Sequence, residues 1–272
     1  MESIPRDLLN TTLGVFCIEV VWSSICFGIT VVQVYLYYRN FGSDPRYQKM
    51  SVATLIILSI ALLVLDVYGL YNYAVTNFGN IPWLETVTWN MKLQIAFDTI
   101  LVICIQVLYA LRIWLFSQYF FRLWGIIVCI LVTIGAVVAV FLVVATYHLQ
   151  SWNDVVHMKQ ILFISFSFST FLDVLMAVSI FYVLWTLNRG SFSRGNSRAM
   201  QISRYVLICG FFTSACSLTA IFLLWTMPNN LVFLAYSFLL PKVYVNSYLA
   251  LLNVRHIVKE SGVEIIPPVA TC

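Results

Sequence analysis

Charged side chains lie within long apolar stretches of this chain, each in a different stretch. They are Glu19, Asp66, Asp98, Asp173 and Lys242. A charge near the centre of a bilayer costs on the order of 2.5 to 3.5 kcal/mol on insertion scales, so such residues normally face protein or water. Two interpretations stay open for this set. One is a buried polar network in which Lys242 pairs with one or two aspartates, and the other is a ligand or ion site open to the outside.

Helical spacing gives each of these charges a polar neighbour. At 100° per residue, residues four positions apart share one face of a helix. The pairs are Glu19 with Ser23, Asp98 with Gln94, Asp173 with Ser169 and Lys242 with Asn246, and Asp66 lies two turns from Ser59. We therefore expect a polar stripe on each charged helix, directed into the protein, with Asn246 as part of the network or ligand site.

The depth of each charge selects a partner for Lys242. At 1.5 Å per residue from the outer boundary, Asp98 lies about 13 Å deep and Lys242 about 16 Å deep. Asp98 is our first choice because the two depths agree within one helical turn, and Asp66 and Asp173 are the alternatives.

The elements that carry these residues are predicted to be membrane helices. The composition is 61% hydrophobic and 10% charged, which leaves too little polar surface for a soluble protein. A span needs about 20 mostly apolar residues. Segments of this length lie near residues 13–38, 51–73, 89–114, 122–147, 159–187, 204–226 and 231–253. Their continuous hydrophobicity argues against a β-barrel.

The predicted fold class is an all-α, polytopic membrane bundle of seven transmembrane helices. Its parts are an external segment at residues 1–12, the transmembrane domain at 13–253 and a cytoplasmic tail at 254–272. Residues 188–203, rich in Gly, Ser and Asn, are expected to form a flexible cytoplasmic tether, where a protein partner can bind.

The basic residues predict the orientation, because cytoplasmic loops are enriched in Lys and Arg. One side collects Arg39, Arg46, Lys49, Arg112, Arg122, Arg189, Arg194, Arg198, Arg204, Arg255 and Lys259, and the other has Arg6, Lys92 and Lys159. This asymmetry places the N-terminus outside and the C-terminus in the cytoplasm. It also explains the net charge of +4 without a nucleic-acid partner. Asn10, in Asn10-Thr11-Thr12, is then a glycosylation candidate on the outer side.

The segment at residues 122–147 has no polar stripe, so we expect it to be the helix most exposed to lipid. Its small residues Gly135 and Ala139 are four positions apart and allow close packing. The packing partner is either another helix of the chain or a second copy in a homodimer.

The last apolar segment carries a resemblance to a known family. The run from Pro241 to Arg255, PKVYVNSYLALLNVR, resembles the closing signature of a large fungal family of seven-helix membrane proteins catalogued as a domain of unknown function. In that family K-x-Y-x-N-S leads into L-N-x-R. Gln106 with the run 110–114, and Gly28 with Gln33 and Tyr37, resemble it too. The resemblance extends over about residues 13–256 and implies a multi-pass membrane protein without an assigned activity.

Better-known classes fit less well. Microbial rhodopsins carry an aspartate four residues before their retinal lysine, whereas Phe238 precedes Lys242 here. Classical G-protein-coupled receptors have an acidic-Arg-Tyr triplet and an N-P-x-x-Y motif, whereas this chain has Leu111-Arg112-Ile113 and Leu240-Pro241. Intramembrane hydrolases need clustered metal ligands or a base beside a serine. We therefore expect no enzyme, no metal and no cofactor.

The function that these observations favour is a receptor-like or sensor-like membrane protein. Its polar layer is expected to bind a small molecule or ion from the outer side. The alternative is a small-molecule or proton-coupled transporter, but the inverted repeats typical of transporters are not apparent in the sequence. Among membranes, we expect the plasma membrane rather than an internal one.

Overall fold

The fold is described by a computed structural model. It describes residues 14–42, 44–77, 86–117, 122–148, 159–190, 196–226 and 232–260. Within these ranges the chain is all α-helical and contains no β-strand. The helices are α2 (Val15–Asn40), α3 (Arg46–Tyr71), α5 (Trp89–Ser117), α6 (Arg122–Tyr147), α8 (Lys159–Gly190), α9 (Asn196–Thr226) and α10 (Val232–Glu260), and a π-helical turn, η2 (Asn72–Thr76), follows α3. This confirms the predicted all-α class.

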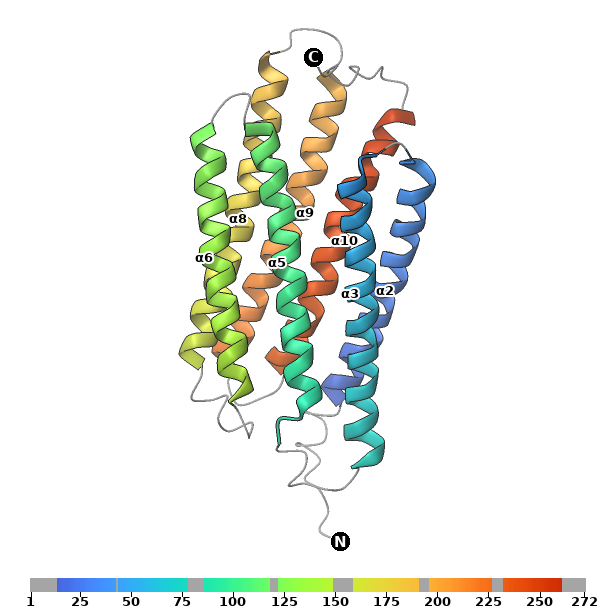
Figure 1. Cartoon of the computed structure of the whole chain (residues 1–272), viewed down its shortest axis with the longest axis vertical. Helices are drawn as coiled ribbons and strands as arrows, with labels where there is room; N and C mark the ends of the chain where they lie inside the picture. Colours follow the sequence, from blue (N-terminus) through green and yellow to red (C-terminus); the bar gives the residue numbers. More distant parts are fainter. Residues whose placement is uncertain are drawn as a thin grey trace.

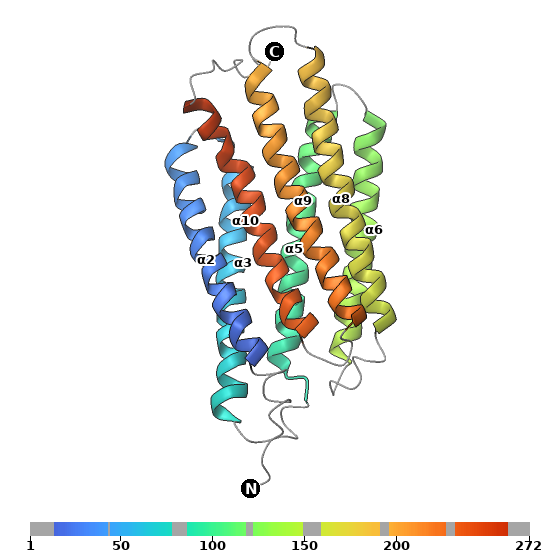
Figure 2. The same cartoon turned by 180° about the vertical axis from the view of Figure 1, so that it is seen from behind.

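The helices form one elongated bundle (Figures 1 and 2). Helices α6 and α8 lie at one edge, α2 and α3 lie at the other, and α5, α9 and α10 lie between them. Helix α10 contacts α2, α3, α5 and α9, and α5 contacts α3, α6, α8 and α10, so these two helices form the centre of the bundle. Helices α2 and α10 begin at the same end of the bundle and run in parallel.

Six of these helices are long and apolar enough to cross a membrane. They are Val15–Asn40, Arg46–Thr76, Trp89–Trp114, Leu123–Tyr147, Gln160–Tyr182 and Ile208–Thr226. Each corresponds to a segment predicted from the sequence. Helix α10 is not among the six by length and composition, although it packs in their midst.

The predicted flexible tether at residues 188–203 is wrong over most of its length. Helix α8 continues to Gly190 and α9 begins at Asn196, which leaves 191–195 outside the described residues. Gly and Ser indicated a loop there. The first turns of α9, however, contain Arg198-Ala199-Met200-Gln201, all strong helix formers, so the helix begins before its apolar part does.

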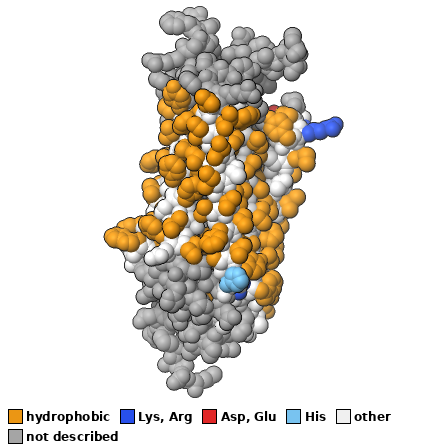
Figure 3. Space-filling view, turned by 60° about the vertical axis from the view of Figure 1, so that its left-hand side comes forward, with side chains coloured by type: hydrophobic (Ala, Val, Ile, Leu, Met, Phe, Trp, Pro, Cys, Tyr) orange, Lys and Arg blue, Asp and Glu red, His pale blue; other side chains and the backbone are white. Residues whose placement is uncertain are grey.

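Helix α6 has the surface expected of a lipid-facing helix. The most apolar stretch of α6 has the highest mean hydropathy among the six helices, 3.3, and the smallest share of buried residues, 17%. Leu123, Val137 and Phe141 are each more than half exposed. Figure 3, which brings the left-hand side of Figure 1 forward, shows a face covered by apolar side chains along most of its length. Helix α6 is thus the least buried of these six helices, which agrees with the prediction that it is the most exposed to lipid.

The small residues of α6 pack within the chain. A Cβ atom at Gly135 would lie 2.5 Å from Cδ1 of Leu172 and 3.2 Å from Cε1 of Phe168, both on α8. The close approach predicted at Gly135 is therefore between α6 and α8. It gives no support to a homodimer, which stays a prediction without a surface assigned to it.

Among the glycines whose surroundings the structure describes, Gly210 has the tightest helix contact, which is between α8 and α9. A Cβ atom at Gly210 would lie 2.4 Å from the Cβ atom of Ala177 and 3.4 Å from its Cα atom. Neither atom is the end of a flexible side chain, so the helices themselves would have to separate.

Gly210→Ala should therefore lower the stability of the bundle. Overpacking of this kind costs about 1 to 3 kcal/mol, and the measurement is thermal unfolding of the detergent-purified protein. Gly28→Ala is the matched control, because nothing lies within 4 Å of a Cβ atom at Gly28. An equal melting temperature for both variants would contradict the described α8–α9 packing.

Candidate functional site

Lys242 is buried near the middle of the bundle and has three oxygen neighbours. Its side chain is 6% exposed, and Nζ lies 3.1 Å from Oδ2 of Asp66 and 3.8 Å from Oε1 of Glu19. Nζ also donates a hydrogen bond of 2.6 Å to the carbonyl oxygen of Phe238, one turn earlier on α10. A lysine ammonium has three protons to donate. The oxygens of Asp66 and Phe238 lie within hydrogen-bond distance of Nζ, whereas Oε1 of Glu19 is an ion-pair contact without a hydrogen bond.

Asp66 is the residue on which this cluster converges. Oδ2 accepts a 2.6 Å hydrogen bond from Ser23 as well as the contact from Lys242, and Oδ1 accepts a hydrogen bond from Gln94. Both oxygens are thus satisfied by groups from α2, α5 and α10. We call Glu19, Ser23, Asp66, Gln94 and Lys242 the lysine cluster.

The prediction that Asp98 is the partner of Lys242 is wrong. The ion pairs of Lys242 within 4.0 Å, among the described residues, are to Asp66 and Glu19. The depth argument was correct in placing these charges in one layer, but it carries no information about direction. Gln94, one turn before Asp98 on α5, reaches Asp66 instead.

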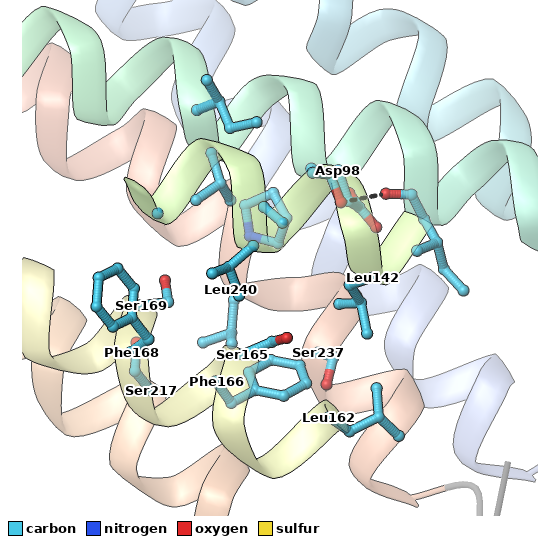
Figure 4. A pocket seen from close by; sticks show the side chains of 18 of the residues that line it. Asp98, Leu142, Leu162, Ser165, Phe166, Phe168, Ser169, Ser217, Ser237 and Leu240 are labelled. Carbon is cyan, nitrogen blue, oxygen red and sulfur yellow. Dashed lines mark hydrogen bonds between the residues drawn. The ribbon is translucent and has the colours of Figure 1, made fainter. Parts of the chain in front are cut away.

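Asp98 is a buried acid without a hydrogen-bond partner. Its side chain is 8% exposed, and neither carboxyl oxygen has a partner among the described residues. It lies on the wall of a cavity of about 160 Å³ between α5, α6, α8 and α10, with Ser217 of α9 also reaching it. Figure 4 shows Asp98 on one side of this space and Ser165, Phe166 and Ser237 on the opposite side.

The lining of the cavity is mainly apolar. Val102, Val138, Leu142, Leu162, Phe166 and Leu240 supply much of it. Several hydroxyl groups in the wall are bonded to their own helix, as in Thr99 to the Ile95 carbonyl and Ser237 to the Phe233 carbonyl. The hydroxyl of Ser165, like the carboxyl of Asp98, has no partner among the described residues. The cavity thus presents two unpaired polar groups in an apolar shell.

Asp173 belongs to a second polar cluster on the other side of α10. Its Oδ2 accepts hydrogen bonds from Tyr244 and, at 3.3 Å, from Ser217. Because residues two apart on a helix point about 200° apart, Tyr244 faces α8 and α9 while Lys242 faces α2 and α3. Ser217 and Tyr244 also line the cavity, so this cluster adjoins it.

Asn246 has a structural contact rather than a place on the cavity wall. Its Nδ2 donates to the Cys26 carbonyl at 3.0 Å, and Asn253 Nδ2 donates to the Gln33 carbonyl at 2.9 Å. Oδ1 of Asn246 accepts a 2.9 Å hydrogen bond from Thr30. Asn246 and Asn253 are seven residues apart, as are Cys26 and Gln33, so the two asparagines join parallel helices at matching levels two turns apart.

The structure divides the predicted charges among three places. Glu19, Asp66 and Lys242 are together, Asp173 is with Tyr244, and Asp98 lies on the cavity wall without a hydrogen-bond partner among the described residues. The glycosylation candidate Asn10 and the end of the tail, residues 261–272, lie outside the described residues.

Apolar helices around an interior that holds the charges define a multi-pass membrane protein, in contact with a lipid bilayer. Within it, residues 169–257 match a family of unknown function, DUF6534. No curated protein and no solved structure matches the chain. The match includes Asp173, Lys242 and Tyr244, and it is narrower than the expected 13–256. The fungal origin and the K-x-Y-x-N-S signature stay predictions.

The partners of Asp173 were not apparent from the sequence. Ser217 and Tyr244 lie 44 and 71 residues from Asp173 along the chain, and both residue types are common in membrane helices. The usable signal was the position of Tyr244, two residues after a buried lysine and therefore on the opposite face of the same helix.

From the contacts of the lysine cluster we expect a second substitution to restore the stability that a Lys242 variant loses. Lys242→Met should destabilise the protein by about 3 to 5 kcal/mol, because it leaves a buried carboxylate without its partner. Adding Asp66→Asn should restore most of the loss, since Asn keeps a side-chain oxygen for Ser23. Thermal unfolding in detergent is the measurement, and Asp98→Asn in place of Asp66→Asn is the control. Rescue by the control alone would show that Lys242 pairs with Asp98.

Proposed function

We propose that this protein is a seven-helix membrane sensor that binds a small molecule in the cavity beside Asp98. The observation that carries the proposal is the cavity itself, which contains a buried carboxyl group and a buried hydroxyl group without partners. Buried polar groups in proteins are nearly always hydrogen-bonded. Two that are not, in the lining of one cavity, favour a ligand that pairs with them. The volume of about 160 Å³ resembles that of an engineered cavity of about 150 Å³ that binds benzene.

Helix α10 is the proposed seventh span. It contains 29 residues, which is enough to cross a bilayer about 30 Å thick. Its lysine reduces its average hydropathy, but the charge is paired inside the bundle and does not face lipid. Burial of Val245, Leu249 and Leu252 against the other helices supports the same conclusion.

The proposed orientation has the N-terminus outside and the C-terminus in the cytoplasm. Arg39 at the end of α2, Arg46 at the start of α3 and Arg112 near the end of α5 lie toward one end of the bundle. Lys92, near the start of α5, lies toward the other. Lys and Arg are enriched on the cytoplasmic side of membrane proteins. The cavity, near the starts of α5, α8 and α10, then lies closer to the outer face.

An epitope tag before Met1 should be accessible to antibody in intact cells, and a tag after Cys272 only after permeabilisation. Surface labelling of the same cells also tests the proposed plasma-membrane location. Labelling of the C-terminal tag in intact cells would reverse the orientation.

Hydrogen bonds that connect the cavity lining to α8 and α9 favour a sensor over a transporter. Tyr244 lines the cavity and donates a hydrogen bond to Asp173 on α8, and its oxygen lies 2.7 Å from that of Ser217 on α9. A ligand in contact with Tyr244 therefore acts on α8 and α9, the two helices joined through the segment 188–203, where we propose the cytoplasmic partner binds. Transporter sites often use helices broken at the site, whereas α10 is continuous through Pro241.

The proposed role is also non-catalytic. The cavity hydroxyl of Ser165 has no hydrogen-bond partner among the described residues, whereas a nucleophilic serine needs a base within reach.

Binding and uptake of three small probes test this function. Benzyl alcohol, benzylamine and benzoate share a ring of the cavity's size and differ in charge. We expect at least one to bind saturably to the purified full-length protein in lipid nanodiscs, without uptake into proteoliposomes. Ser165→Phe places a ring in the cavity and should abolish this binding. Absence of saturable binding by all three probes would contradict the proposal, and protein-dependent uptake would favour the transporter alternative.

Transmission to the cytoplasmic side has a separate test. A bound probe should change hydrogen exchange of the segment 188–203, and Tyr244→Phe should reduce that change while the probe still binds. Tyr236→Phe is the matched control, since Tyr236 is on the same helix and does not line the cavity. An undiminished change in Tyr244→Phe would exclude this hydroxyl from the connection.

A further inference from the structure

The charges around the cavity do not balance. Glu19, Asp66 and Asp98 are buried close to a single buried cation, Lys242, among the described residues. An isolated ionised carboxylate in an apolar interior is strongly unfavourable, so it is either paired or held neutral. Asp98 is the acid of this group that faces the cavity.

The close contacts of Lys242 are with oxygens other than those of Asp98. Its ammonium group contacts Asp66 at 3.1 Å, Glu19 at 3.8 Å and the Phe238 carbonyl at 2.6 Å. These contacts lie on the α2 and α3 side of α10, and Lys242 does not line the cavity. Three buried acids thus share one ammonium group, and the acid that faces the cavity, Asp98, is not among its ion pairs within 4.0 Å.

The surroundings of Asp98 select among cations. A metal ion such as Ca²⁺ takes 6 to 8 oxygen ligands. The cavity lining offers one carboxyl group, that of Asp98, among mainly apolar side chains such as Val102 and Leu142. Such a wall suits an apolar body. The hydroxyl of Ser165, on the opposite side in Figure 4, can bond a polar group at the far end of that body.

We propose that the ligand is a small organic cation, whose ammonium group pairs with Asp98 while its apolar part fills the cavity between α5, α6, α8 and α10. This inference rests on the proposed ligand-binding function and names the class of ligand. In such a complex the ammonium group supplies the partner that Asp98 lacks, and the apolar wall excludes water from the pair.

The three ring probes distinguish this inference from the function on which it rests. Titration of the full-length protein in nanodiscs should show benzylamine binding at least about tenfold more tightly than benzyl alcohol, since a charged partner left unpaired in a buried site is strongly unfavourable. Benzoate should bind most weakly. Ser165→Phe protein in the same nanodiscs measures the probe that partitions into lipid, and this signal is subtracted. Benzyl alcohol binding as tightly as benzylamine would overturn the inference and leave the function intact, whereas no saturable binding by any probe would overturn both.

Asp98→Asn then tests the residue. It should remove the preference for benzylamine over benzyl alcohol while the melting temperature of the empty protein stays equal or rises, because the described structure gives Asp98 no hydrogen bond that the change would remove. The matched control is Asp173→Asn, a buried acid outside this cavity, which should keep the preference. An Asp98→Asn protein that still prefers the cation, or that is destabilised when empty, would overturn the assignment.

Discussion

A lysine ammonium in the middle of a membrane bundle must be surrounded by oxygen atoms, and the arrangement of the central helices follows from this requirement. Lys242 obtains its oxygens from α2, α3 and its own helix. Asp66 is in turn fixed by Ser23 and Gln94. Breaking a buried pair costs about 3 to 5 kcal/mol, a large share of the stability of a typical domain. The register of α2, α3, α5 and α10 is thus constrained at one level.

A second constraint holds α2 against α10 nearer the C-terminal end of α10. The side-chain amides of Asn246 and Asn253 reach backbone carbonyls of α2 at two points. In an apolar environment these hydrogen bonds are directional contacts in an otherwise non-specific packing. Model-peptide and protein measurements put such interhelical bonds at about 0.6 to 2 kcal/mol each. With α10 held on this side, its other side is left to border the cavity and the Asp173 cluster.

The sequence was sufficient for the helices but not for their pairing. Hydropathy located the six helices that meet the length and composition of spans, because a continuous apolar run of about 20 residues matches the thickness of the bilayer core. The exposure of α6 followed from its lack of a polar stripe. The predicted start of α9 was less accurate, because polar helix-forming residues extend this helix beyond its apolar part.

Within the site, periodicity correctly directed the charges into the protein, and counting residues along the helices predicted a common layer for them. It did not identify Asp66 as the partner of Lys242, because distance along the bundle axis says nothing about which helix lies beside which. Nor did it show that Asp98 is unpaired, since that depends on where Gln94 and Lys242 point. Which side chains meet between helices is decided by the tertiary structure, and the pattern of a single sequence does not reveal it.

An experimental structure of the full-length protein with benzylamine bound, at a resolution that places side chains, tests the central claim most directly. The account predicts Nζ of Lys242 on Asp66 and the ligand nitrogen within hydrogen-bond distance of Asp98, with the ring between Leu142 and Phe166. A structure in which Lys242 contacts Asp98 instead, with the cavity closed or the ligand elsewhere, would contradict it.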